Sequence, residues 1–177
     1  MIWLSKNLES TYIMRIATWN INSVRLRLSQ VLRVLEEYDF DVLCLQETKT
    51  RDVSFPANDI AEAGWPYQAI RGEKSYNGVA ILSRFPIEKT SYQDWVGKGD
   101  CRHIAAQIKG INIHNIYLPA GGDIPDRDEN IKFGHKLDFV SEVTEYFEQN
   151  KPSKSVLVGD LNIAPLAEDV WSTKQLR

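Results

Sequence analysis

The chain has 177 residues, of which 43% are hydrophobic and 25% charged, with a formal net charge of −3. This composition excludes a disordered chain and fits one soluble globular domain, and no apolar run approaches the roughly 20 residues of a membrane helix. The charge lacks the strongly basic footprint of many DNA-binding proteins, but a catalytic domain can keep a local basic rim around an acidic metal site. The candidates for such a rim are Arg25, Arg27, Lys49, Arg51, Arg71, Lys74 and Arg102.

The N-terminal residues indicate where the domain begins, and the cysteines indicate the cellular compartment. Residues 1–13 lack the apolar core and cleavage site of a secretory signal, so we expect an extension ahead of a start at Met14, with the domain spanning 14–177. The two cysteines, Cys44 and Cys101, form no CxxC pair and no disulfide framework, which favours the reducing cytoplasm. We expect Cys44 to lie in the core.

Hydrophobic periodicity predicts a strand, a helix and a second strand near the N-terminus. A strand over 15–21 precedes Ser23, which we expect to cap a helix that ends near Tyr38. The apolar stripe of this helix consists of Leu28, Val31, Leu32 and Leu35. A β-rich run over 41–46 follows, and a strand, helix and strand within about 30 residues favour a parallel strand pair.

The rest of the chain predicts short strands and one long helix. The expected elements are a helix at 58–63, strands at 67–71, 78–83, 104–108, 111–117 and 155–161, and a helix at 133–147. Lys109-Gly110 is a two-residue hairpin signal between antiparallel strands. Parallel and antiparallel pairs together predict an α/β fold with a mixed sheet.

Three apolar runs end in polar side chains. Asn20 and Glu47 follow the first two strands, and the run V-L-V-G-D-L-N-I, which we expect to be a buried strand, delivers Asp160 and Asn162. Ligands of α/β sheets bind beyond the carboxyl ends of the strands, so these groups are expected to converge on one cation. Such oxygen ligands favour Mg²⁺ or Mn²⁺ over zinc. The alternative is that each carboxylate caps a helix or lies exposed in a loop.

A Mg²⁺ site beside an aspartate suits phosphodiester hydrolysis, because the metal neutralises phosphate charge while the carboxylate orients or deprotonates water. Tyr117 can donate a hydrogen bond to phosphate, although a tyrosine at a strand end is often a packing residue. The histidines show no metal-binding spacing, and we expect His114 to be structural or on the surface. No GxSxG, GxxxxGK[ST] or GxGxxG motif occurs, which excludes serine hydrolases, P-loop proteins and Rossmann cofactor sites.

Five motifs, in this order and spacing, carry a family resemblance. They are M-R-I-A-T-W-N-I-N-S-V-R, L-Q-E-T-K, Y-N-G-V-A-I-L-S, I-Y-L-P-A-G-G and G-D-L-N-I-A-P. Together they resemble the bacterial exonuclease III group, the abasic-site endonuclease branch of the endonuclease/exonuclease/phosphatase superfamily. The resemblance covers residues 14 to about 176.

The resemblance implies a four-layered α/β sandwich of two packed sheets. It also implies a monomeric, Mg²⁺-dependent DNA repair nuclease, which cuts duplex DNA 5′ to abasic sites and removes nucleotides from 3′ ends. Mn²⁺ is the alternative metal.

Residue roles follow from position in these motifs. The implied metal ligands are Asn20, Glu47, Asp160 and Asn162, with Glu47 as the principal one. The implied catalytic residues are Tyr117, Asp160, which activates water, and Asn162, which contacts phosphate. The implied DNA contacts are Asn22, Lys49 and Arg102.

Family members continue past this point into a second half with further strands, a catalytic Asp and a terminal Ser-Asp-His motif. None of these is present in the sequence, so we expect a fold whose second half is missing. The missing strands are expected to leave the apolar face of the first sheet uncovered, with weak stability and severely reduced activity. Two alternatives are a catalytically inactive remnant and a superfamily phosphatase or sphingomyelinase that acts on small or lipid phosphoesters.

Overall fold

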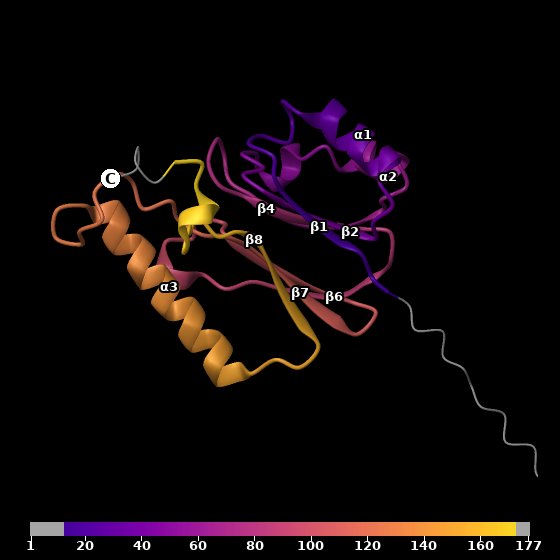
Figure 1. Cartoon of the computed structure of the whole chain (residues 1–177). Helices are drawn as coiled ribbons and strands as arrows, with labels where there is room; N and C mark the ends of the chain where they lie inside the picture. Colours follow the sequence, from indigo (N-terminus) through magenta and orange to yellow (C-terminus); the bar gives the residue numbers. More distant parts are fainter. Residues whose placement is uncertain (1–12, 173–177) are drawn as a thin grey trace, which may run out of the picture.

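The computed structural model describes residues 13–172 and contains two four-stranded sheets packed face to face between helices (Figure 1). The first sheet has the order β1 (Ile16–Asn20), β2 (Val42–Gln46), β4 (Val79–Ser83), β3 (Tyr67–Arg71). The second has the order β5 (Ile87–Ser91), β6 (His103–Ile108), β7 (Ile111–Tyr117), β8 (Ser155–Asp160). Only β1 with β2 and β7 with β8 are parallel, so both sheets are mixed.

Helices cover the outer faces of both sheets. The helices are α1 (Leu28–Glu37), α2 (Ala57–Glu62) and α3 (Ile131–Asn150), with short 3₁₀ turns at Asp52–Ser54, Trp95–Gly97 and Ala167–Asp169. In Figure 1, α1 and α2 lie over the first sheet and α3 lies along the second. The predicted four-layered α/β sandwich is therefore confirmed.

Three apolar clusters hold these layers together. One joins the helices α1 and α2 to the first sheet and includes Val31, Leu43 and Ile60. A second lies between the sheets and contains Cys44, as predicted. A third joins the second sheet to α3 through Phe139. Strand β2 is buried along its whole length because its successive side chains alternate between the first two clusters.

The predicted cap at Ser23 is wrong, because α1 begins at Leu28. Ser23 has a φ of 88°, and its N–H donates to the carbonyl of Glu47 at 2.7 Å. The N–H of Val24 donates in the same way to Thr48 at 3.2 Å. These bonds fix the segment after β1 to the segment after β2, so the helix starts one turn later.

The prediction that 155–161 forms a buried strand is also wrong. Strand β8 lies at the edge of its sheet, where Val156 is 37% and Leu157 43% exposed. Both faces of the first sheet are packed, so its apolar face is not left uncovered, contrary to the prediction. A run of exposed apolar side chains lies instead on β8 and the segment after it, at Val156, Leu157, Leu161, Ile163, Leu166 and Trp171. The edge strand β5 was not predicted, because its sequence I-E-K-T-S lacks an apolar pattern.

The predicted extension over 1–13 lies almost wholly outside the described residues, so the start at Met14 stays a prediction. Within residues 13–172, no helix has the length and apolar character needed to span a membrane.

A buried amide pair connects the two sheets. Asn115 on β7 is fully buried, and its Oδ1 accepts a 2.6 Å bond from the Nε2 of Gln46 on β2. Its Nδ2 donates to the carbonyls of Leu45 and Ala80, each at 2.9 Å. One side chain of the second sheet thus contacts two strands of the first, which fixes how the sheets are aligned.

Asn115→Ala removes all three bonds. At about 1 kcal/mol per bond, we expect the free energy of unfolding to fall by about 3 kcal/mol, as measured by urea unfolding with tryptophan fluorescence. Asn112→Ala is the matched control, because Asn112 lies on the same strand and its side chain makes no hydrogen bond within residues 13–172. Equal losses in the two variants would contradict this role of Asn115.

Candidate active site

The ends of three strands meet at one edge of the sandwich. Asn20 ends β1, Glu47 follows β2, and Asp160 ends β8. The Nδ2 of Asn20 donates to Glu47 Oε1 and to Asp160 Oδ2, both at 2.8 Å. One amide therefore bridges two carboxylates that come from different sheets and lie far apart in the sequence.

Tyr117 completes this cluster from the end of β7. Its hydroxyl donates to Glu47 Oε1 at 2.8 Å. Burial, followed by the hydrogen bond to Glu47 and the negative charge of that residue, raises the pKa of Tyr117 to about 12. The phenol is therefore a protonated donor at neutral pH.

Glu47 is held in one orientation by three donors. Burial alone would raise its pKa, but the bonds from Asn20, Lys49 and Tyr117 outweigh burial and leave the pKa below its usual value. Lys49 Nζ lies 2.7 Å from Glu47 Oε2 and 2.5 Å from Asn22 Oδ1. Glu47 and Lys49 both have positive φ, 53° and 49°, and such strained backbone is typical of functional sites.

The carboxylate oxygens of the site suit a hard divalent cation. Oxygens of Glu47 and Asp160 lie 2.8 Å from the same nitrogen, and a cation relieves the repulsion between two such carboxylates. Within residues 13–172, no group of three or more His, Cys, Asp or Glu is placed to hold a metal ion. Mg²⁺ commonly needs only one or two carboxylates together with water and substrate phosphate.

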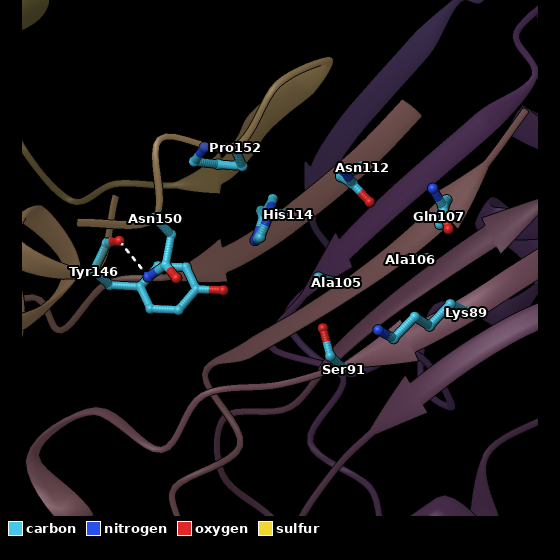
Figure 2. Close-up of a pocket in the computed structure, with 10 residues that line it drawn as sticks. All are labelled: Lys89, Ser91, Ala105, Ala106, Gln107, Asn112, His114, Tyr146, Asn150 and Pro152. Atoms are coloured by element: carbon cyan, nitrogen blue, oxygen red, sulfur yellow. Dashed lines mark hydrogen bonds between the residues drawn. The ribbon is translucent and has the colours of Figure 1, made fainter. Parts of the chain in front are cut away.

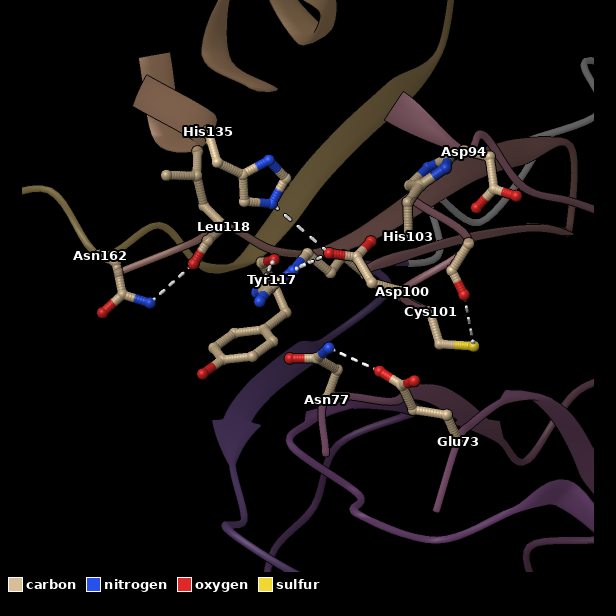
Figure 3. Close-up of polar contacts among 12 residues, drawn as sticks. Glu73, Asn77, Asp94, Asp100, Cys101, His103, Tyr117, Leu118, His135 and Asn162 are labelled. Carbon is tan, nitrogen blue, oxygen red and sulfur yellow. Dashed lines mark hydrogen bonds and ion pairs between the residues drawn. The ribbon is translucent and has the colours of Figure 1, made fainter. Parts of the chain in front are cut away.

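Asn162 lies beside Asp160. Its Nδ2 donates to the carbonyl of Leu118 at 2.8 Å (Figure 3). Its backbone N–H donates to Asp160 Oδ1 at 3.1 Å. Its own carbonyl accepts from Lys136 on α3 at 2.6 Å. In this arrangement the backbone N–H of Asn162 orients Asp160, and Leu118 holds the side-chain amide. The predicted roles of Asn162 in binding metal and phosphate stay predictions.

A close approach explains the glycine before Asp160. Gly159 has a φ of 145°, and a Cβ at this position would lie 1.9 Å from the carbonyl oxygen of Ile116 on β7. Any side chain would push β8 away from β7, and Asp160 would move with it. The glycine therefore allows β8 to approach β7 closely.

Arg102 lies against Tyr117 and is largely buried. Its side chain is only 15% exposed, its guanidinium carbon lies 4.7 Å from the centre of the Tyr117 ring, and its Nη1 donates to the Tyr117 carbonyl at 3.2 Å. Its Nε donates to Asp100 Oδ2 at 2.6 Å. The Nε2 of His135 on α3 lies 3.6 Å from the same oxygen (Figure 3).

Sequence reasoning missed Asp100 and His135. The only local signal was an acidic residue two positions before a predicted DNA-contacting arginine. Nothing in the sequence indicated that α3 would bring His135 to Asp100, because that contact depends on tertiary packing.

Apart from Arg102, the predicted basic rim divides into two groups. Arg27 bonds to the carbonyl of Asn22, and Arg71 pairs with Asp94. The other group lines a cavity of about 150 Å³ beside Glu47, which is formed by Arg25, Lys49, Thr50, Arg51, Ser54, Lys74 and Ser75. Of the predicted DNA contacts, Asn22 and Lys49 therefore lie between the carboxylates and this cavity, and Arg102 lies on the Tyr117 side.

The chain is similar to known nucleases and phosphatases. Exodeoxyribonuclease III of Haemophilus influenzae is 28% identical over 168 residues, which cover 89% of this chain and 60% of that protein. Two solved structures have TM-scores of 0.83: a 3′ phosphatase from Neisseria bound to a product DNA hairpin, 34% identical, and an AP endonuclease from Archaeoglobus fulgidus, 35% identical. Each match covers 93% of this chain but only 64% and 63% of those chains. The chain thus spans less than two thirds of these relatives.

The match to a family model covers nearly all of the described residues. Residues 17–177 match the model of the endonuclease/exonuclease/phosphatase family. This range includes every strand but the first residue of β1, and all the side chains of the three converging strand ends. The chain therefore belongs to the endonuclease/exonuclease/phosphatase family.

Proposed function

We propose that this protein is a Mg²⁺-dependent DNA repair nuclease that cuts duplex DNA 5′ to abasic sites and removes nucleotides from 3′ ends. The observation that carries the proposal is the Asn20 amide that joins Glu47 to Asp160. The names of the relatives support it, since they include an exodeoxyribonuclease III, an AP endonuclease and a phosphatase bound to DNA.

Glu47 and Asp160 would hold the Mg²⁺, with Mn²⁺ as the alternative, and Asn20 would keep the two carboxylates in place. When bound, the metal supplies positive charge to the scissile phosphate. Asp160 is fixed by N–H donors from Asn20 and Asn162, which leaves its carboxylate oriented to accept a proton from the attacking water. The Tyr117 hydroxyl, protonated at neutral pH, would donate to a phosphate oxygen.

The basic cavity can bind the phosphate backbone of DNA beside the carboxylates. Arg25, Arg51 and Lys74 are exposed, and no carboxylate lines the cavity that they share with three hydroxyl side chains. Such a group can neutralise a phosphate without reading sequence. We propose that a monomer binds one duplex in this way, in the cytoplasm.

The direct test is incision of a duplex oligonucleotide with one abasic site, in Mg²⁺ and in EDTA. We expect metal-dependent cleavage 5′ to the site, and Asp160→Asn should lower kcat by about 10²- to 10⁴-fold because the variant cannot take the proton. Circular dichroism should show that the variant keeps its fold.

A positive control and two alternative substrates accompany this test. A full-length relative serves as the positive control, and inositol phosphates and sphingomyelin test the phosphoesterase alternative. No incision beside an active relative would favour the inactive remnant. Faster hydrolysis of a small or lipid phosphoester would overturn the choice of substrate.

The basic cavity predicts a change in salt dependence. Each phosphate contact contributes about 0.9 to the slope of log K against log salt, so Arg25→Ala/Arg51→Ala/Lys74→Ala should reduce the slope by up to about 2.7. Fluorescence anisotropy in EDTA measures the binding of DNA without cleavage. Arg33→Ala on α1 is the control, because its side chain is 68% exposed and lies outside the cavity. An unchanged slope in the triple variant would rule out contacts between DNA phosphates and this cavity.

We expect Asp100 to affect incision indirectly, by holding Arg102 in position. Asp100→Asn removes the carboxylate that holds Arg102 against Tyr117, and the resulting misplacement should lower kcat/KM for incision by about tenfold or more. Asp94→Asn is the matched control, since Asp94 pairs with Arg71, whose guanidinium carbon lies 4.1 Å from the Tyr92 ring centre. The two pairs have the same chemistry, but only one contacts the site. Similar losses in both variants would indicate a general effect on stability.

A further inference from the structure

A second polar cavity lies on the outer face of the second sheet, at the opposite end of β7 from Tyr117 (Figure 2). Its volume is about 260 Å³, and it opens where the C-terminal half of α3 meets strands β5, β6 and β7. The polar side chains around it are Lys89, Ser91, Gln107, Asn112, His114, Tyr146 and Asn150. No Asp or Glu lines it, so its only formal charge is the ammonium group of Lys89.

The proton positions of two histidines follow from one backbone bond. The N–H of Gln93 donates to Nδ1 of His103 at 2.9 Å, so this nitrogen carries no proton. His103 is neutral, because burial, followed by the nearby His114 and Arg71, lowers its pKa to about 3. Its proton therefore lies on Nε2, which is 3.1 Å from Nδ1 of His114.

The same argument fixes the proton of His114. Its Nδ1 accepts the bond from His103, and burial lowers its pKa, so the neutral ring carries its proton on Nε2. His114 is only 5% exposed and borders the cavity, yet its Nε2 has no partner among the described residues. This N–H is not among the buried side-chain atoms without a partner, so it opens to the cavity and can donate to a ligand there.

The chemistry of the lining selects an anion. The Nε2 of His114 has no free lone pair, so it cannot bind a metal ion. Lys89 has no acidic partner within residues 13–172, and the hydroxyl of Ser91 and the amide of Asn112 add donors. We propose that this cavity binds a small oxyanion, with phosphate as the representative ligand, between the His114 N–H and the Lys89 ammonium group.

This site is independent of the proposed nuclease activity, and it can be tested by binding alone. The chain has only three histidines, so a long-range ¹H–¹⁵N spectrum of histidine-labelled protein resolves each ring nitrogen. Inorganic phosphate is titrated against chloride at constant ionic strength. We expect a saturable shift of His114 Nε2, while His135, near the nuclease site, reports any phosphate bound there.

Lys89→Ala is the decisive variant, because Lys89 lies exposed on an edge strand and its loss should not disturb the fold. We expect phosphate to bind about tenfold more weakly, since one charge-assisted bond is lost. Lys132→Ala is the control, because it removes an exposed lysine from the other end of α3. Unchanged His103 and His114 signals in the free variants show that both are folded.

Two further ligands identify the source of the oxyanion. Tighter binding of a deoxynucleoside 5′-monophosphate than of phosphate would assign the site to organic phosphates, and the reverse order would assign it to the free ion. The proposal is overturned if His114 Nε2 shows no saturable shift, or if Lys89→Ala and Lys132→Ala bind phosphate equally.

Discussion

The buried bond between Gln46 and Asn115 sets the position of every group in the candidate active site. Gln46 immediately precedes Glu47, and Asn115 lies two residues before Tyr117. Within the sheets, Gln46 pairs with Asn20 and Tyr117 pairs with Asp160. The inter-sheet bonds of Asn115 and two parallel pairings therefore determine how Asn20, Glu47, Tyr117 and Asp160 meet. The two sheets must stay aligned for the site to exist.

The site places two negative groups together before any cation is bound. Asn20 shares one amide between Glu47 and Asp160, and Lys49 adds a positive charge to the other Glu47 oxygen. These contacts lower the repulsion enough for both carboxylates to face the same space. They also restrict the rotation of the side chains, so the oxygens are already oriented when a ligand arrives. The strained backbone at Glu47 is consistent with such preorganisation, because a relaxed turn would direct its side chain elsewhere.

Local patterns in the sequence predicted the elements that are stabilised locally. The hairpin at Lys109-Gly110 has positive φ at both residues, as a two-residue turn requires, and it was predicted from those two residues alone. The polar ends of β1, β2 and β8 were predicted because each follows an apolar run. The start of α1 was mispredicted, since Ser23 bonds to the segment after β2 and not to its own helix. The Asp100–His135 contact could not be predicted, because it joins a loop to α3 across the fold.

Helix α3 and strand β7 connect two sites of opposite chemistry. Near its N-terminal end, α3 supplies His135 and Lys136 to the carboxylate site, and near its C-terminal end it supplies Tyr146 to the donor-rich cavity. Tyr146 follows Lys136 by about 15 Å along the helix axis, so small ligands in the two sites do not touch each other. Their charges differ in the same way: two carboxylates lie where β7 ends, and a lysine with neutral polar side chains lies at its start. The two ends of β7 therefore attract ligands of opposite charge, a cation at the carboxylates and an anion at the lysine.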